Sequence, residues 1–337
     1  MPASSSSLPE WCRAYGDRLI LGLTKQTPCD FRVVERVNFA LTGDGEHDYL
    51  WIEKTGANTA WVARMLAQHA GVAQRDVGYA GLKDRHAVTR QWFSVRRPSK
   101  QGTDWGELKI EGVRILEADR HQRKLKRGAH AGNRFHIALR EVITDDVDIE
   151  HRLETISARG IPNYFGAQRF GRGANNLQMA AGLAAGKRMQ REKRGIALSA
   201  ARSFLFNEIL SARVADGSWD KALPGDTLNL DGSGSVFVPD GIDDAITRRI
   251  AALDVHPTGA LWGDIQAGAD SAPALLERTI ADRYPEYVQC LRAARMKPAR
   301  RALRTVVREL TWQIEETDIY LEFELDRGSF ATSVLRE

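Results

Sequence analysis

The sequence predicts an α+β protein in which β-rich first and last parts form one discontinuous domain around a mainly helical insertion. Strand-like alternation recurs through residues 1–158 with two helical patterns among it, and it returns at residues 319–326. At 337 residues the chain is also longer than one compact core of usual size. We therefore expect one domain from residues 1–158 and 304–337 and an inserted domain from residues 159–303.

Alternation of apolar and polar residues predicts four strands in the first part. They lie at residues 30–35, 77–84, 87–95 and 134–140, and the second of them runs into a glycine turn. A helix is expected at residues 58–71, where Asn58 suits the N-cap and Gly71 the C′ position. A second helix is expected from about Asp145 to Gly160.

Helical periodicity dominates the insertion. Residues 198–212 place apolar side chains on one helix face, namely Leu198, Ala201, Leu205, Ile209 and Ala212. Residues 226–238 predict a hairpin with a Gly/Ser turn, and helical pattern resumes through residues 275–295. The strand at residues 319–326 then turns Ile319, Leu321, Phe323 and Leu325 to one face, so we expect it to rejoin the first sheet.

Several classes of function have no support in the sequence. There is no HExxH, no GxxxxGK[ST], no GxSxG and no G-x-G-x-x-G at a strand-to-helix turn, so we expect no metal and no nucleotide cofactor. No apolar run is long enough to span a bilayer. Three scattered cysteines and no secretory signal pattern predict a protein of the reducing cytoplasm.

The net charge of +4 and the pI of about 9.0 are basic, and the distribution of charge is more informative than its sum. Dense basic clusters occur at residues 120–130, 186–195 and 292–304. Any one of them can be a solvated surface. Three in one chain favour a polyanionic partner, most simply a nucleic acid.

The stretch GLKDRHAVTRQW places one aspartate, Asp84, among several cations at a glycine turn. An ionised aspartate can act as a nucleophile or as a general base. Neighbouring cations would keep it ionised, and the candidates are Lys83, Arg85, His86 and Lys25. The alternatives are that Asp84 only caps a turn and that Lys25 is an ordinary exposed lysine.

The surrounding residues GYAGLKDRHAVTRQWFSV resemble the catalytic signature of the TruD family of tRNA pseudouridine synthases. Further blocks resemble the family in the same order: LTKQTPCDFRVVE (23–35), RKLKRGAHAGNRFHIALR (123–140), GIPNYFGAQRFG (160–171), LSAARSFLFN (198–207) and GSFATSVLRE (328–337). The resemblance implies a pseudouridine-synthase-type catalytic domain, built on a mostly antiparallel sheet flanked by helices. It also implies that the insertion is a mainly helical α/β TRUD domain.

The resemblance further implies that the protein isomerises uridine to pseudouridine in tRNA, at position 13 of the D-arm, without a metal or other cofactor. It assigns Asp84 as the catalytic aspartate and Lys25 as the residue that supports it. Four residues would contact the substrate: Phe31, Asn133, Phe135 and Phe330. For Phe31 and Phe330 the alternative is core packing, because both lie in alternating strand patterns.

A tRNA substrate would explain the basic clusters as a positive groove that contacts phosphates. Its residues would be Arg123, Lys124, Lys126, Arg127, Arg169, Lys187 and Arg188. The block at residues 162–169 can contact RNA through Asn163, Gln168 and Arg169, or it can be a structural hinge. We expect a monomer; the rival functions are a non-catalytic tRNA-binding chaperone of the same fold and a nuclease or glycosylase that uses Asp84.

Overall fold

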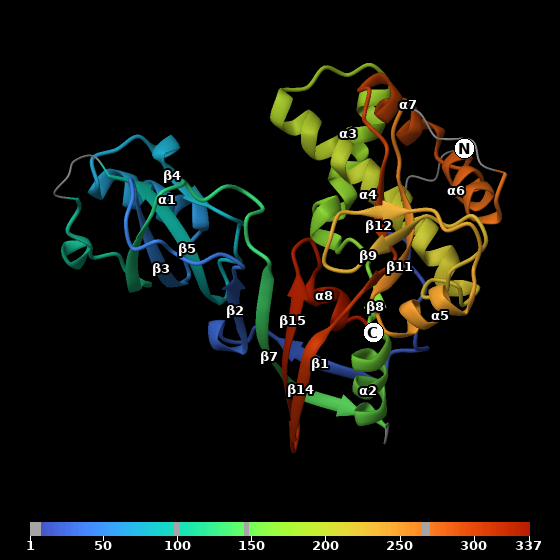
Figure 1. The fold of residues 1–337 in the computed structure, drawn as a ribbon, viewed down its shortest axis with the longest axis horizontal. Coiled ribbons are helices and arrows are strands. Elements are labelled where there is room, and N and C mark those ends of the chain that lie inside the picture. The colour runs from blue at the N-terminus through green and yellow to red at the C-terminus, as the bar shows by residue number, and fades with distance from the viewer. Residues whose placement is uncertain (1–7, 98–101, 145–147, 265–269) are drawn as a thin grey trace. The chain divides into compact units, whose positions relative to one another are not determined.

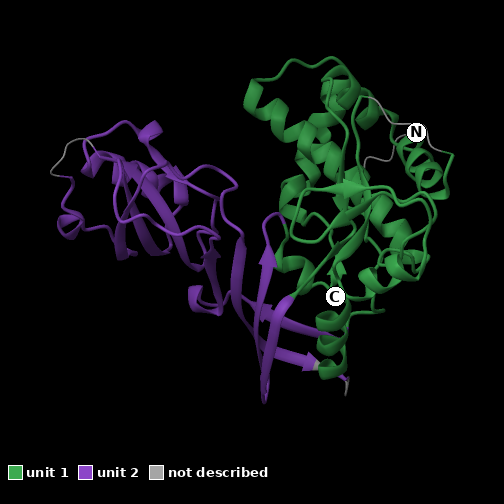
Figure 2. Ribbon diagram, in the orientation of Figure 1, with its two compact units in different colours: residues 1–18, 149–307, 329–337 green, residues 19–148, 308–328 purple. Residues whose placement is uncertain are grey.

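The protein forms two compact units in the computed structural model, which describes residues 8–97, 102–144, 148–264 and 270–337 (Figure 1). Unit 1 comprises Met1–Arg18, Ile149–Val307 and Ser329–Glu337 (Figure 2). Unit 2 comprises Leu19–Asp148 and Arg308–Gly328. Both units are therefore discontinuous in sequence.

Unit 2 is built on one nine-stranded sheet with the strand order β14-β15-β7-β2-β5-β3-β6, to which β1 adds beside β7 and β4 beside β5. Its strands are β1 (Ile20–Thr24), β2 (Phe31–Arg36), β3 (His47–Thr55), β4 (Val77–Tyr79), β5 (Val88–Arg96), β6 (Val113–His121), β7 (Gly132–Thr144), β14 (Arg308–Glu315) and β15 (Asp318–Asp326). Every pairing is antiparallel except that of β2 with β5. The mostly antiparallel sheet is confirmed, and the predicted strand near the C-terminus pairs with β7 along eight residues.

Alternation along β7 and β15 separates the two faces of this sheet as predicted. Phe135 and Ile137 are buried on β7, and Leu321 and Phe323 are buried on β15. Glu324 is buried too, against the expectation for a polar position, because Arg36 lies 2.7 Å from its carboxylate. The sequence patterns did not reveal β1, β3, β6 or β14.

Helix α1 (Thr59–His69) covers part of the unit 2 sheet. Val62 and Leu66 pack with Leu50 of β3 and Phe93 of β5 in one buried cluster. Asn58 is the N-cap residue, although its side chain makes no capping hydrogen bond. Gly71 follows the helix with φ +64°, which is the left-handed conformation expected at C′.

Unit 1 contains most of the helices and a smaller sheet with the order β10-β9-β11-β12. The helices are α2 (Ile149–Arg159), α3 (Asn175–Ala184), α4 (Arg191–Ala215), α5 (Asp244–Ala251), α6 (Ala272–Asp282), α7 (Pro285–Ala293) and α8 (Ala331–Val334). The strands are β9 (Leu228–Leu230), β10 (Val236–Phe237), β11 (Val255–Leu261) and β12 (Ala299–Ala302), with a separate pair β8 (Ile161–Pro162) and β13 (Arg304–Thr305). The predicted start of the second helix, Asp145, lies outside the described residues.

Helix α4 forms the centre of unit 1. The predicted face is confirmed, since Leu198, Ala201, Leu205 and Ile209 are buried in one cluster with Ala260 of β11. The hairpin predicted at residues 226–238 is β9 and β10. The helical pattern at residues 275–295 forms two helices, because Pro285 has no N–H to continue the first and begins the second.

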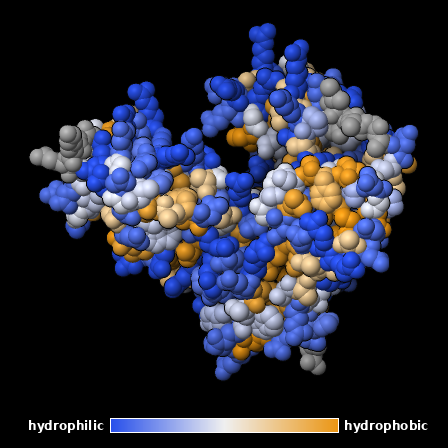
Figure 3. Space-filling model, in the orientation of Figure 1, coloured by the Kyte–Doolittle hydropathy of each residue, from blue (hydrophilic) through white to orange (hydrophobic). Residues whose placement is uncertain are grey.

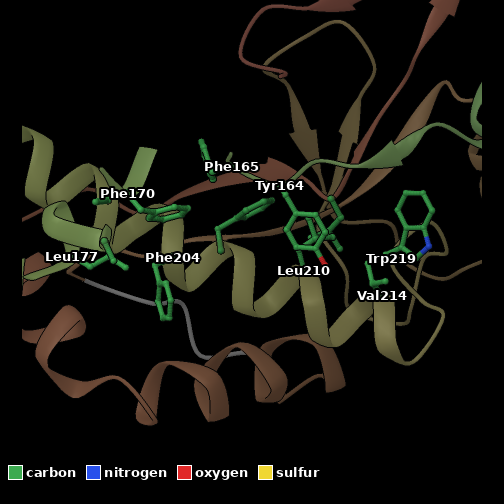
Figure 4. Packing of buried hydrophobic residues seen from close by; sticks show 12 residues of the cluster. Tyr164, Phe165, Phe170, Leu177, Phe204, Leu210, Val214 and Trp219 are labelled. Atoms are coloured by element: carbon green, nitrogen blue, oxygen red, sulfur yellow. The ribbon is translucent and has the colours of Figure 1, made fainter. Parts of the chain in front are cut away.

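A second cluster of unit 1 is rich in aromatic rings. Phe170, Phe204, Phe206 and Trp219 are buried around α4, and Tyr164 packs among them (Figure 4). At the far end of α4, the Arg213 guanidinium donates to both carboxylate oxygens of the buried Asp226 at 3.0 Å.

None of the helices in the described ranges combines the length and apolar composition that crossing a bilayer requires. On the face shown in Figure 3, hydrophilic residues predominate on both units and hydrophobic residues gather in separate patches. Cys12, Cys29 and Cys290 are free thiols.

Candidate active site

Residues 81–84 lie in the loop between β4 and β5 of unit 2, which is held by two buried polar side chains, Gln91 of β5 and Thr59 of α1. The Gln91 side chain donates to the carbonyl of Gly81 at 3.1 Å, and the Lys83 N–H donates to the Thr59 hydroxyl at 3.0 Å. Thr59 in turn donates to the Gln91 side chain at 3.0 Å. This network fixes the backbone from which Asp84 projects.

The Asp84 carboxylate accepts a different hydrogen bond on each oxygen. Its Oδ2 accepts from the Lys25 ammonium, and its Oδ1 accepts from the His86 N–H at 2.9 Å. The second contact is a local turn cap, as the structural alternative for Asp84 predicts. Because the side chain is still 35% exposed, the cap leaves part of the carboxylate open to a substrate.

The electrostatic surroundings keep Asp84 ionised. Partial burial raises the pKa of this carboxyl, but the hydrogen bonds from Lys25 and the His86 N–H lower it more, so the pKa lies below its ordinary value of 3.8. Of the other three candidate cations, His86 adds a smaller charge effect that also lowers the Asp84 pKa. The remaining two lie elsewhere: Arg85 donates to the carbonyl of Gly56 at 2.9 Å, and Lys83 turns toward Glu35. Lys25 is therefore the cation that holds the aspartate.

Lys25 adopts an uncommon backbone conformation directly after β1. Its φ is +57°, which is the left-handed region that residues other than glycine rarely occupy. Its ammonium pairs with the Asp84 carboxylate and also lies 4.2 Å from the centroid of the Phe31 ring. Backbone strain of this kind is concentrated at functional sites in proteins.

Three phenylalanines on the neighbouring strands β2, β7 and β15 contact one another. The rings of Phe31 and Phe135 meet edge to face at 6.2 Å, and Phe135 stacks on Phe323 at 5.4 Å. Phe31 is 6% exposed and Phe135 7%. Both are thus buried core residues in this structure.

Asn133 is joined to the Asp84 loop through the buried ion pair of Lys83 and Glu35. The Lys83 ammonium donates to the Asn133 Oδ1 and lies 3.3 Å from the Glu35 carboxylate. Burial lowers the pKa of Lys83, and the Glu35 carboxylate opposes that effect. The Trp92 N–H donates to the other Glu35 oxygen at 3.1 Å.

A fully buried lysine, Lys54, binds the backbone of Asp84. The Lys54 ammonium donates to the backbone carbonyl of Asp84 at 2.9 Å, and Lys54 is 0% exposed. Sequence reasoning missed Lys54 and Glu35. A signal existed for Glu35, which takes the place of an apolar residue in the alternation of Phe31 and Val33, whereas Lys54 has no such signal.

The basic segment Arg123–Arg127 lies on the surface of unit 2. Its four basic side chains are exposed, while Leu125 between them is buried and its N–H donates to Ser94 at 2.9 Å. Arg127 lies 3.8 Å from the centroid of the Tyr79 ring. The buried leucine therefore anchors a surface of cations.

The remaining predicted residues belong to unit 1. Phe330 and Arg169 line a pocket of about 750 Å³ together with Trp11 and Phe165. The Phe330 and Phe165 rings are 6.3 Å apart, and the Arg169 guanidinium lies 5.3 Å from the Phe165 centroid. Lys187 and Arg188 are exposed.

The turn after β8 is structural in its first half. The Asn163 side chain donates to the carbonyl of Ala302 at 2.9 Å, and Tyr164 and Phe165 are buried in the aromatic cluster (Figure 4). Gln168 and Arg169, by contrast, are exposed. Among the described residues, no group of three or more His, Cys, Asp or Glu side chains is arranged to hold a metal ion.

Comparison with known proteins gives one consistent result. The family model described as tRNA pseudouridine synthase D (TruD) matches residues 13–183 and 175–337. A Pseudomonas syringae protein named tRNA pseudouridine synthase D is 49% identical over 328 residues, which cover 96% of this chain and 93% of that protein. Proteins of the same name from Methylococcus capsulatus and Hydrogenovibrio crunogenus are 46% and 41% identical, and cover 96% and 98% of this chain and 93% and 96% of their own length.

The fold has a solved counterpart. A crystal structure from Methanosarcina mazei, assigned to the same name, superposes with a TM-score of 0.72 and covers 96% of this chain and 95% of its own. At 19% sequence identity this likeness shows a shared fold. From the family match over nearly its whole length and from relatives of up to 49% identity, the chain belongs to the TruD family of tRNA pseudouridine synthases.

Proposed function

We propose that this protein isomerises uridine to pseudouridine in tRNA, with Asp84 as the catalytic aspartate and position 13 of the D-arm as the target. The observation that supports it most directly is the state of Asp84, an ionised and partly exposed carboxylate on a loop that Gln91 and Thr59 hold in place. The family to which the chain belongs supports the substrate class and the reaction.

The reaction requires one carboxylate and binding of the RNA. The N1–C1′ bond breaks, the uracil turns over, and C5 bonds to C1′, while a hydrogen leaves C5 and another is gained at N1. Nothing is oxidised, so the chemistry needs no redox cofactor. An ionised carboxylate suits each possible route: attack on the base, attack on C1′, or removal of a proton from the sugar.

The residues around Asp84 would hold the extruded base. Lys25 keeps the carboxylate charged, and the Asn133 amide meets the edge of the uracil. Phe31 and Phe135, each slightly exposed, would provide apolar contact to the base. The family resemblance assigns a substrate contact to Phe330 as well, which lies in unit 1. Extruding a uridine from a stack costs a few kcal/mol, which such contacts and phosphate contacts offset.

The exposed basic side chains would hold the tRNA backbone. Phosphate contacts position an RNA without reading its sequence, which suits recognition of a folded tRNA by its shape. The residues proposed for this role are Arg123, Lys124, Lys126 and Arg127 of unit 2 and Arg169, Lys187 and Arg188 of unit 1.

From the family resemblance we propose a catalytic domain of residues 1–158 and 304–337 and an inserted TRUD domain of residues 159–303. The two compact units divide the chain differently, because Met1–Arg18, Ile149–Val307 and Ser329–Glu337 together form unit 1. The pairing of β15 with β7 supports the return of the chain to the first sheet. We also propose that the protein acts as a monomer in the cytoplasm, where its free thiols would stay reduced.

The decisive experiment is carbodiimide mapping of pseudouridine in tRNA transcripts incubated with purified protein. We expect one modified uridine with the wild type and none with Asp84→Asn, while Asp44→Asn, at an exposed aspartate of the same unit, behaves as the wild type. Pseudouridine formation by Asp84→Asn would refute the assignment. Broken strands or released uracil would favour the nuclease or glycosylase, and faster tRNA folding by both proteins without modification would favour the chaperone.

A further inference from the structure

The side-chain amide of Asn133 is oriented by a buried ion pair. Asn133 of β7 and Glu35 of β2 are direct cross-strand neighbours, and Lys83 reaches both of them from the catalytic loop. The Lys83 and Glu35 side chains are 5% and 0% exposed. Solvent therefore offers Lys83 little alternative to these two partners.

This contact determines which end of the amide is left for a ligand. An ammonium group has three donors and no acceptor, so the amide atom that faces Lys83 has to be the oxygen. The reversed amide would set its own donors against the ammonium and leave a buried donor without a partner. The NH2 group of Asn133 is thus turned away from Lys83, and no residue in the described part of the chain accepts a hydrogen bond from it.

We propose that Lys83 and Glu35 are positioning residues that make Asn133 a hydrogen-bond donor to O4 of the target uracil, and so select uridine over cytidine. This inference rests on the proposed function. Uracil has a carbonyl acceptor at C4, whereas cytosine has an amino donor there. A donor that cannot rotate forms a hydrogen bond with the C4 carbonyl of uracil. The same donor would face another donor, the C4 amino group, if the base were cytosine.

The same contacts join recognition of the base to the position of the catalytic aspartate. Lys83 is the residue before Asp84, and its N–H is bound by the Thr59 hydroxyl at 3.0 Å. Glu35 is fixed independently by the Trp92 N–H at 3.1 Å. Because its neighbours are anchored in this way, Asn133 can reverse its amide only if the Lys83 ammonium is removed.

The test measures binding of two tRNA transcripts that differ only in U or C at the modified position. An Asp84→Asn background prevents turnover, and Lys83→Met is added to it. We expect the background protein to prefer the U transcript by about 10-fold or more, and Lys83→Met to reduce this ratio below about 3-fold, since one mispaired polar contact changes affinity by roughly 10-fold. Lys126→Met, which removes an exposed cation, is the matched control and should weaken both transcripts without changing the ratio.

A ratio that survives Lys83→Met, or a background ratio near one, would overturn the inference. Equal weakening of both transcripts by Lys83→Met would also overturn it, because that is the effect of a merely structural pair. Should Lys83→Met unfold by leaving the Glu35 charge buried, the double change Glu35→Gln with Lys83→Met removes both charges and makes the same prediction. Pseudouridine formation by the wild type is measured separately. If the wild type forms no pseudouridine, the proposed function is refuted; if only the U-to-C binding ratio is unchanged, this inference alone is refuted.

Discussion

Lys54 provides the sharpest test of the electrostatics around the Asp84 loop. It is 0% exposed, and burial lowers its pKa from 10.5 to about 8, although the nearby Asp84 carboxylate opposes the effect. A folded-state pKa below the unfolded value means that the unfolded chain holds this proton more tightly. The charged form of Lys54 therefore destabilises the folded protein, and replacing it by methionine should relieve that destabilisation.

The size and pH range of the effect follow from the two pKa values. The difference between 10.5 and about 8 corresponds to roughly 3 kcal/mol, because one pKa unit is worth about 1.4 kcal/mol. Between pH 8 and 10.5 the unfolded state binds more protons, so this contribution makes the wild type more stable as pH rises. Below pH 8 the full destabilisation is present. Lys54→Met removes it but also removes the hydrogen bond to the Asp84 carbonyl, worth about 1 kcal/mol.

We expect Lys54→Met to be more stable than the wild type by roughly 2 kcal/mol at pH 7 and to lose this advantage above pH 10. Urea unfolding at several pH values between 7 and 10.5 measures the difference, and Lys126→Met, at an exposed lysine, should follow the wild type throughout. Free energies of unfolding that change in parallel for wild type and Lys54→Met would show that Lys54 titrates as an ordinary lysine. That result would refute the reasoning.

Three further changes test other parts of the structure. Lys25→Met should move the acid limb of the pH–rate profile to higher pH. The Asp84 carboxylate then loses the hydrogen bond that lowers its pKa, while the burial that raises its pKa remains; an acid limb at the wild-type pH would contradict this. Arg213→Met should cost about 3–5 kcal/mol in urea unfolding by leaving the Asp226 charge buried and unpaired, and a loss below 1 kcal/mol would contradict that. Affinity for tRNA should fall steeply with salt, and replacing the cations of residues 123–127 should flatten the slope by roughly one for each phosphate that the protein no longer neutralises; an unchanged slope would contradict their role.

Local patterns predicted the elements whose periodicity is uninterrupted. The alternation in β7 and β15 and the apolar face of α4 depend only on neighbours a few residues away, so the sequence contains them directly. Strands β3 and β6 escaped prediction. In β3 both faces are largely buried, with Tyr49, Leu50 and Ile52 almost inaccessible, so a clean alternation is absent.

Pairing across long stretches of chain was beyond the local patterns. The parallel contact between β2 and β5 joins strands separated by β3, α1 and β4, and no turn signal marks it. The burial of Lys54 depends on such pairings, because β3 lies between β5 and β6 in the finished sheet. A lysine is ordinarily exposed, and nothing nearby in the sequence marks this one as an exception.

The amino-acid sequence by itself determined the family, the types of most elements and the aspartate on which the chemistry was expected to depend. Only the tertiary structure decided which cation serves that aspartate. Lys83 and Arg85 flank Asp84 in the chain, yet Lys25, which is 59 residues away, is the one that binds its carboxylate. The physical reason is that neighbouring side chains in a tight loop point in different directions. Lys25 lies between β1 and β2, so the pairing of these two strands with β7 determines that its charge lies beside Asp84.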